Sequence, residues 1–257
     1  MKINLPQPDM SENISPNTLK YKSALIKLSG EALVGKSQDR GDRAILDGEI
    51  LRGVASQIKK CVNHGAKIAL VIGAGNIWRG SRQGGVDISR VKADHMGMLG
   101  TLINCIALGD VLERTGVESR VLSAVPVSQF CGEYSQEKAK RLMADGVVIL
   151  IACGVGYPYF STDTAAMLRG AELGVDVVLS AKAVSGVYDK DPAVYPDAVK
   201  YEKLDYDTII KKNLRVIDQT AAALGRDNNT KALLFSLLEE DGIFKALSGE
   251  QIGTLIV

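Results

Sequence analysis

Histidine is scarce in this sequence of 257 residues, in which only His64 and His95 occur. Catalysis that depends on an imidazole base therefore has few candidates. Cysteine is scarce as well, and none of the four thiols stands in a C-x-x-C pair: Cys61, Cys105, Cys131 and Cys153. Scattered cysteines disfavour a zinc site and a disulfide framework, and they fit a reduced, cytoplasmic compartment.

A surplus of charge is also lacking, since 31 lysines and arginines face 30 acidic residues and leave a net charge of +1. Such a balance gives no general field for nucleic acid or a membrane surface, so neither is expected as a partner. We expect no apolar run of the chain to span a bilayer. Residues 1–20 are polar, contain three prolines and lack the apolar core of a signal peptide, so we expect a loose tail before a single domain over residues 21–257.

The chain does contain an alternation of apolar strands and amphipathic helices. Strand-like runs cover residues 23–28, 67–72, 119–124, 147–152, 176–181 and 254–257. Helical patterns lie between them, the first from about Asp47 and a long one from about Asp94. Continuously apolar strands joined by helices predict an α/β fold with a mainly parallel sheet covered on both faces.

Two lysines compete for a phosphate site near the start of the domain. Residues 30–37 spell the P-loop pattern G-x-x-x-x-G-K-[ST], which would place Lys36 on the phosphates. A P-loop also needs a helix directly after that lysine, whereas the residues that follow are polar, include a glycine and show no apolar period. Lys27 ends an apolar strand before the turn Ser29-Gly30-Glu31, and it is the better candidate if other phosphate-binding turns converge on it.

Small-residue turns follow further strands. Ligands of open parallel sheets bind at the carboxyl ends of the strands, which here lead into Gly73-Ala74-Gly75-Asn76 and into residues 154–163. Glycine lets backbone N–H groups approach an anion closely. A dinucleotide fingerprint fails, because its third glycine would fall on Trp78. Taken singly, each turn could also be a tight strand-to-helix connection.

Three acids lie near these turns. Asp163 and Asp218 stand at expected helix starts and could be N-caps, and Asp191 lies in a turn before Pro192. Each is ambiguous alone, and their joint occurrence near the glycine turns favours a functional role.

Seven short segments occur together in an order known from one family. They are Lys27-Leu28-Ser29-Gly30-Glu31, Gly73-x-Gly75-Asn76-x-x-Arg79-Gly80, Ala93-Asp94-His95-Met96-Gly97-Met98-Leu99, Phe160-Ser161-Thr162-Asp163-Thr164, Gly186-Val187-Tyr188-x-x-Asp191-Pro192, Asp218-x-x-Ala221 and Gly249-Glu250-x-Ile252-Gly253-Thr254-Leu255. In this combination, from about Lys20 to Val257, the chain resembles the bacterial UMP kinases of the amino acid kinase superfamily.

The resemblance implies a three-layer α/β/α sandwich around a mainly parallel sheet, assembled as a homohexamer. It also implies transfer of the ATP γ-phosphoryl group to UMP, giving UDP, with Mg²⁺ held through the nucleotide phosphates and not by a direct protein ligand. Because the acceptor is already an anionic phosphate, such a reaction needs positioning and charge neutralisation more than a strong base.

The resemblance also implies roles for individual residues. Lys27 would contact the transferring phosphoryl group, and Asp163 and Asp218 would orient the lysine and the metal-bound phosphates. The backbone of Gly73, Ala74 and Gly75 would cradle phosphates. UMP would meet Ala74, Arg79 at its phosphate, Asp94 at its ribose, and Val155, Gly156, Tyr157, Pro158, Tyr159, Phe160, Ser161 and Thr162. ATP would meet Lys27, Ser29, Gly30, Gly75, Lys182, Tyr188 and Asp191.

Three positions depart from the family pattern. Ala74 stands where glycine is usual, Ser185 where aspartate is common, and Val155 where a hydroxyl could contact uracil. Backbone groups of the turn at residues 154–160 are therefore expected to recognise the base.

A GTP site between subunits, present in some UMP kinases, is also altered here. By position it falls on Gly109, Asp110, Glu113, Arg120 and Val147. Only Arg120 among these is basic, so we expect activation by GTP to be weak or absent.

Two other functions remain open. A sister kinase of the same fold could phosphorylate a carboxylate such as acetylglutamate or carbamate, although Arg79 and the Asp94 segment match the nucleotide branch. A non-catalytic binding protein could share the fold, although Lys27, Asp163 and Asp218 are retained.

Overall fold

A mainly parallel sheet organises the chain. The computed structural model describes residues 19–34, 44–78, 87–182, 184–190, 192, 194–214 and 216–257. Within them nine strands form one sheet in the order β4-β3-β5-β2-β1-β6-β10-β11-β9. The strands are β1 (Ser23–Leu28), β2 (Lys67–Ile72), β3 (Ser119–Ser123), β4 (Gly132–Glu133), β5 (Val148–Ala152), β6 (Val177–Lys182), β9 (Lys203–Leu204), β10 (Ala232–Ser236) and β11 (Gly253–Ile256). Neighbouring strands run parallel except β10 and β11.

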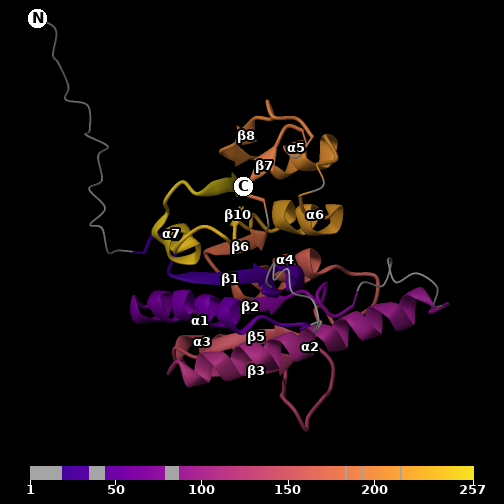
Figure 1. The fold of residues 1–257 in the computed structure, drawn as a ribbon, viewed down its shortest axis with the longest axis vertical. Helices are drawn as coiled ribbons and strands as arrows, with labels where there is room; N and C mark the ends of the chain where they lie inside the picture. The colour runs from indigo at the N-terminus through magenta and orange to yellow at the C-terminus, as the bar shows by residue number, and fades with distance from the viewer. Residues whose placement is uncertain are drawn as a thin grey trace, which may run out of the picture.

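Helices cover both faces of this sheet, as the continuously apolar strands predict. The helices are α1 (Gly48–Asn63), α2 (Arg90–Arg114), α3 (Gln136–Ala144), α4 (Thr162–Leu173), α5 (Tyr206–Lys211), α6 (Gln219–Asp227) and α7 (Gly242–Ser248), with a short 3₁₀ turn η1 (Gly30–Leu33) after β1. Buried residues of α1, α2 and α7 share one core layer, and those of α3, α4, α5 and α6 share the other. The predicted three-layer α/β/α sandwich is confirmed (Figure 1).

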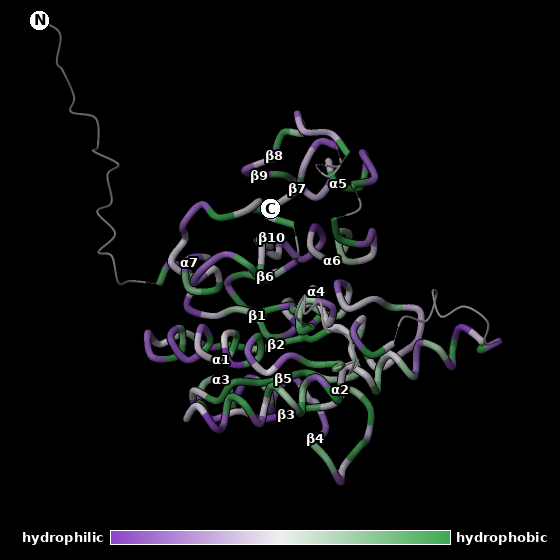
Figure 2. The backbone as a smooth tube through the Cα atoms, viewed as in Figure 1, coloured by the Kyte–Doolittle hydropathy of each residue, from purple (hydrophilic) through white to green (hydrophobic). Residues whose placement is uncertain are grey.

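The central strand β1 shows how the sequence builds two core layers. Ala24, Ile26 and Leu28 belong to the layer of α1 and α2, and Leu25 to that of α4 and α6. Successive side chains of a strand point to opposite faces, so a strand buried on both faces must be apolar throughout. Figure 2 shows this as hydrophobic colour along β1, β2 and β5. Lys27 interrupts the run on the α4 face.

A small two-stranded sheet follows β6. It pairs β7 (Val187–Tyr188) with β8 (Lys200–Tyr201) in antiparallel fashion. Figure 1 shows it beside α5, on the side of β10 that faces away from β1. The Val187 N–H donates to Thr254 Oγ1 (2.9 Å), which ties this sheet to β11.

The predicted helix starts are confirmed with small shifts. Asp47 caps α1, since its carboxylate accepts from the N–H groups of Glu49 (2.8 Å) and Ile50 (3.2 Å). The long helix begins at Arg90, one turn before the expected Asp94. Of the predicted tail, residues 1–18 lie outside the described residues, and Leu19 is buried in the core.

The expectation that no apolar run could span a bilayer needs correction. By length and composition alone, α2 is long and apolar enough to do so. One side of α2 packs into the core beside the sheet, through Leu102, Cys105, Leu108 and Leu112. The core helix of a globular protein passes the same test, so α2 carries no argument for a membrane.

Candidate active site

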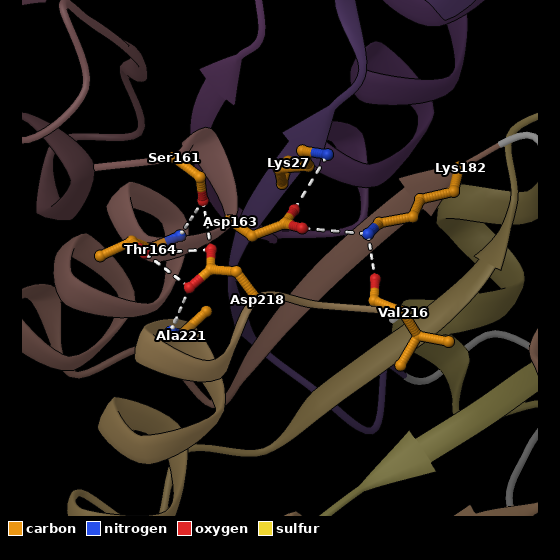
Figure 3. Close-up of polar contacts among 8 residues, drawn as sticks. All are labelled: Lys27, Ser161, Asp163, Thr164, Lys182, Val216, Asp218 and Ala221. Carbon is orange, nitrogen blue, oxygen red and sulfur yellow. Dashed lines mark hydrogen bonds and ion pairs between the residues drawn. The ribbon is translucent and has the colours of Figure 1, made fainter. Parts of the chain in front are cut away.

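Three charged side chains meet where β1 and β6 end. The Lys27 ammonium lies 3.0 Å from Asp163 Oδ1, and the Lys182 ammonium lies 3.0 Å from Asp163 Oδ2. Figure 3 shows both lysines pointing at this one carboxylate. Lys27 is on β1, Lys182 ends β6, and Asp163 is in the first turn of α4, which covers the same face of the sheet. These three side chains carry a net charge of +1, which favours the binding of an anion.

Burial and charge together set the ionisation of this cluster. Burial opposes the charged form of Asp163, yet the ammonium groups of Lys27 and Lys182 outweigh it and hold the pKa of this carboxyl below its ordinary value. Burial also lowers the pKa of Lys182, and the Lys27 cation adds to this effect. The negative charge of Asp163 raises the pKa of Lys182 and offsets only part of this lowering. The Lys182 pKa therefore lies below that of an ordinary lysine.

Asp218 lies beside this cluster with other partners. It caps α6, because its Oδ1 accepts from the Ala221 N–H (2.9 Å). It also accepts hydrogen bonds from the hydroxyls of Ser161 and Thr164 (Figure 3). The N-cap interpretation of Asp218 is thus confirmed, and its charge raises the pKa of Lys182 as one of the smaller influences.

Asp163, in contrast, is not an N-cap. Ser161 caps α4, since its Oγ accepts from the Thr164 N–H (3.0 Å). The carboxylate of Asp163 is therefore left for the two lysines.

The glycine turns after β1 and β2 touch each other backbone to backbone. A Cβ on Gly30 would collide with the Gly73 carbonyl, and a Cβ on Gly75 would lie 2.9 Å from the Glu31 side chain. At Gly30 the obstacle is backbone, so this position requires glycine for packing, whereas a side chain at Gly75 would only have to displace that of Glu31. The Gly73 N–H donates to the Leu28 carbonyl (2.9 Å), which ties the second turn to the strand that carries Lys27.

Ala74, where glycine is usual in the family, fits without backbone strain. It does not have a positive φ. Its methyl group lies where α2 carries Gly100: a Cβ added there would be 2.9 Å from the Ala74 Cβ. The missing side chain at position 100 makes room for the extra methyl at position 74.

A cavity of about 300 Å³ opens beside the lysine cluster. Eight residues predicted from the sequence line it: Ala74, Gly75, Asp94, Val155, Tyr157, Phe160, Ser161 and Thr162. It is also lined by residues to which the sequence analysis assigned no role in the site: Val71, Trp78, Ala93, Gly97, Met98, Thr101, Cys153 and Gly154. The structure thus brings the turn after β2, the start of α2 and the turn after β5 together.

Asp94 anchors the turn after β5. Both of its carboxylate oxygens accept from Arg90 Nε (3.0 and 2.8 Å), and Oδ2 also accepts from the Tyr159 N–H (2.8 Å). The Arg90 guanidinium lies 5.5 Å from the centroid of the Tyr159 ring. Arg90 was missed from the sequence, although its i,i+4 spacing from Asp94 on a helix is a usable signal.

The remaining predicted residues are placed as follows. Gly156 has φ +90, and an added Cβ would be 3.0 Å from the Ala124 carbonyl oxygen. Neither Gly156 nor Pro158 lines the cavity. On the ATP side, Ser29 and Gly30 form the turn after β1, and Tyr188 is in β7. Its hydroxyl is 2.7 Å from that of Ser185, the position where aspartate is common. Arg79, Asp191 and the rival Lys36 lie outside the described residues.

The lysine of the P-loop alternative and the start of its expected helix fall on residues 35–43, which lie outside the described residues. Among the residues that the structure describes after them, the first helix is α1, which begins at Gly48 behind its Asp47 cap. Two glycine turns and Asp163 lie around Lys27. This meets the condition that the sequence analysis set for Lys27, namely that other candidate phosphate-binding turns lie close to it.

A family model described as the amino acid kinase family matches residues 22–236. The chain belongs to the amino acid kinase family. Solved structures agree: a UMP kinase from Ureaplasma parvum is 34% identical with a TM-score of 0.85, and the match covers 93% of this chain and 99% of that one. A UMP kinase from Bacillus anthracis is 36% identical with a TM-score of 0.86, over 92% and 96% of the two chains.

A more distant family member has the same fold. The uridylate kinase from Archaeoglobus fulgidus is 25% identical with a TM-score of 0.70, over 91% of this chain and 99% of that one. The resemblance stated from the sequence is therefore confirmed at the level of the family.

Proposed function

We propose that this amino acid kinase transfers the γ-phosphoryl group of ATP to UMP, giving UDP and ADP, in the cytoplasm as a step of pyrimidine nucleotide synthesis. The observation that carries the proposal is the Lys27–Asp163–Lys182 cluster beside a cavity that also holds Asp94. The solved structures compared above include two UMP kinases at 34% and 36% identity, which favours UMP as acceptor.

The chemistry follows from these side chains. A phosphate oxygen of UMP forms a bond to the γ-phosphorus while the bond from that phosphorus to the ADP oxygen breaks. Lys27 and Lys182 neutralise charge on the transferring group, and Asp163 fixes both ammonium groups at one place. Backbone N–H groups of the Gly73–Gly75 turn are suited to cradle phosphate oxygens.

Magnesium fits this arrangement through the substrate. Asp163 is engaged by two lysines and Asp218 by a helix cap and two hydroxyls, so neither carboxylate stands free for direct ligation. Mg²⁺, when bound through the ATP phosphates, supplies further neutralisation of phosphate charge.

The acceptor side is assigned as follows. Asp94 and the turn after β5, which line the cavity, are assigned to the UMP ribose and base, and Arg79 is assigned to the UMP phosphate. Tyr188, Asp191 and Lys182 are assigned to ATP. A single catalytic domain over residues 21–257 accommodates both nucleotides.

Self-association is supported by one face of α2. Met96, Leu99, Ile103 and Ile106 are 39–52% exposed, and they form an apolar row on the helix that is otherwise packed on the sheet. Covering such a row favours a homo-oligomer, and we propose the homohexamer usual for the family. Sedimentation of the purified chain tests this, and a monomer at micromolar concentration would contradict it.

ADP release measured with UMP, CMP, dUMP, acetylglutamate and carbamate tests the function. We expect release with UMP above all others. Release with a carboxylate acceptor alone would support the sister kinase. Nucleotide binding without any ADP release would support a binding protein.

A further inference from the structure

The side-chain amides of Asn104 and Asn76 form a pair behind the Gly73–Gly75 turn. Asn104, in the middle of α2, is fully buried. Its amide donates to the Gly73 carbonyl (2.7 Å) and to Asn76 Oδ1 (2.9 Å). The Asn76 amide donates in return to Asn104 Oδ1 (3.0 Å) and to the Ile45 carbonyl (2.7 Å). All four amide hydrogens of the pair are therefore used.

Packing does not account for an amide at position 104. An apolar side chain of similar size would fill the same space, whereas a buried amide is costly unless its polar atoms are paired. A fully paired network, in contrast, selects one arrangement of the groups that it joins. Here it joins α2, the turn after β2 and the segment before α1.

The carbonyl that Asn104 holds belongs to the turn assigned to phosphates. The Gly73 N–H donates to the Leu28 carbonyl, directly after Lys27, so Gly73 is held from both sides. Gly30 approaches the Gly73 carbonyl and the Asn76 amide oxygen so closely that it has no room for a Cβ. A shift of the amide pair would therefore move both glycine turns.

We propose that Asn104 is a positioning residue for phosphoryl transfer. Through the Gly73 carbonyl and Asn76 it sets the backbone of the Gly73–Gly75 turn relative to Lys27. The inference rests on the proposed function, because it assigns this turn to the transferring phosphates. Asn104 touches no substrate itself and acts only through the turn.

The decisive variant is Asn104→Leu, which removes the amide and keeps the branching and the number of side-chain heavy atoms. We expect kcat for UDP formation to fall about 10²-fold, the scale of a displacement of about 1 Å at a reacting group. The KM values for UMP and ATP should change less than about threefold, because the loss is in alignment and not in uniform binding.

A second pair of variants covers the case in which Asn104→Leu fails to fold. Asn76→Ala removes the less buried partner, and we expect a smaller loss of kcat of the same kind. Combining Asn76→Ala with Asn104→Ala should cost no more than Asn104→Ala alone, since both act through one network. Additive losses would overturn the shared mechanism.

The matched control for lost stability is Tyr206→Phe. It deletes one buried hydroxyl bond, to the Thr230 carbonyl (2.7 Å), on α5 and away from the cavity. We expect a lower Tm with unchanged kcat. If Asn104→Leu behaves in the same way, Asn104 is merely structural and the inference is overturned. If the unmodified chain makes no UDP, the proposed function fails and the inference fails with it.

Discussion

The lysine cluster around Asp163 and the turn after β5 are built in opposite ways. Lys27 and Lys182 come from strands, and their side chains are 10% and 20% exposed around one carboxylate. The turn instead exposes its aromatic side chains, with Tyr157 at 72% and Tyr159 at 64%.

Their backbones differ as well. Cys153 and Tyr159 adopt positive φ angles of 62° and 72°, which non-glycine residues rarely do. Residues in such conformations cluster at functional sites. The lysines are thus held by strands of the sheet, whereas the residues proposed to recognise the acceptor lie on a loop, where substitutions are tolerated without disturbing the fold.

The largest effect should come from the rigid end. We expect Lys27→Ala to lower turnover about 10²-fold or more, the scale of losing one transition-state charge contact. Lys36→Ala is the matched control, because it removes the lysine of the P-loop pattern. Initial rates of ADP release with UMP measure both. A defect in the Lys36 variant with an active Lys27 variant would restore the P-loop.

Asp163→Asn should have a smaller effect on rate and a distinct effect on pH dependence. Both cations stay, so we expect kcat to fall roughly tenfold, or about 1.4 kcal/mol. Asp163 raises the pKa of Lys182, which burial lowers. Without this carboxylate, Lys182 should lose its proton at lower pH, so the alkaline decline of kcat should begin at lower pH than in the unmodified enzyme.

Asp176→Asn is the control for this experiment. Asp176 accepts from the Lys22 and Ser23 N–H groups (2.7 and 2.8 Å) at the opposite edge of the sheet. Its removal changes the net charge equally and should leave the alkaline limb of kcat in place. An alkaline limb that moves equally in both variants would show a general charge effect.

The loop end should decide the acceptor. We expect kcat/KM for UMP to exceed that for CMP by about tenfold or more, because uracil and cytosine present opposite hydrogen-bonding groups and unpaired polar groups are costly. Val155→Thr should change this ratio little if backbone groups of the turn recognise the base. Equal kcat/KM for both nucleotides would contradict that role for the turn.

The smallest effect should be that of GTP. A cavity of about 340 Å³ contains Gly109, Asp110, Glu113 and Arg120, but Val147 does not line it. Arg120 lies 3.0 Å from Glu118 and 3.8 Å from Glu113, so its charge is already opposed. Rates at saturating UMP and ATP should rise little with GTP. A large activation that Arg120→Ala abolishes would prove this wrong.

The strand-borne part of this contrast was predictable from the sequence. A lysine inside an apolar run, followed by small residues, indicates a functional residue at the end of a strand. Lys27 contacts Asp163, as the resemblance implied. The parallel sheet followed equally from strands that are apolar on both faces. The loop-borne part was predictable only as a set of residues, because its positive φ angles and the bond from the Tyr159 N–H to Asp94 have no local signature.

Helix α2 shows why some residues escaped the sequence. Its helical pattern includes Leu99, Leu102, Ile103 and Ile106, and the sequence does not separate the buried Leu102 from the other three, which are exposed. An exposed apolar row, proposed above to serve self-association, has the same period as an apolar row that packs in the core. Against that background Asn104 resembles an ordinary surface amide, and only the Gly73 carbonyl beside it reveals its position.

The contact between Ala74 and Gly100 has a consequence for how such a chain could change over generations. The two positions share space for one methyl group, since a Cβ at 100 would lie 2.9 Å from that of Ala74. A lineage that first exchanges alanine for glycine at 74 gains room for a side chain at 100. If the substitution at 100 comes first, its side chain collides with Ala74 in the turn after β2. The order in which the substitutions at 74 and 100 occur, and not their identity alone, therefore decides which variants of this protein can arise without a steric clash.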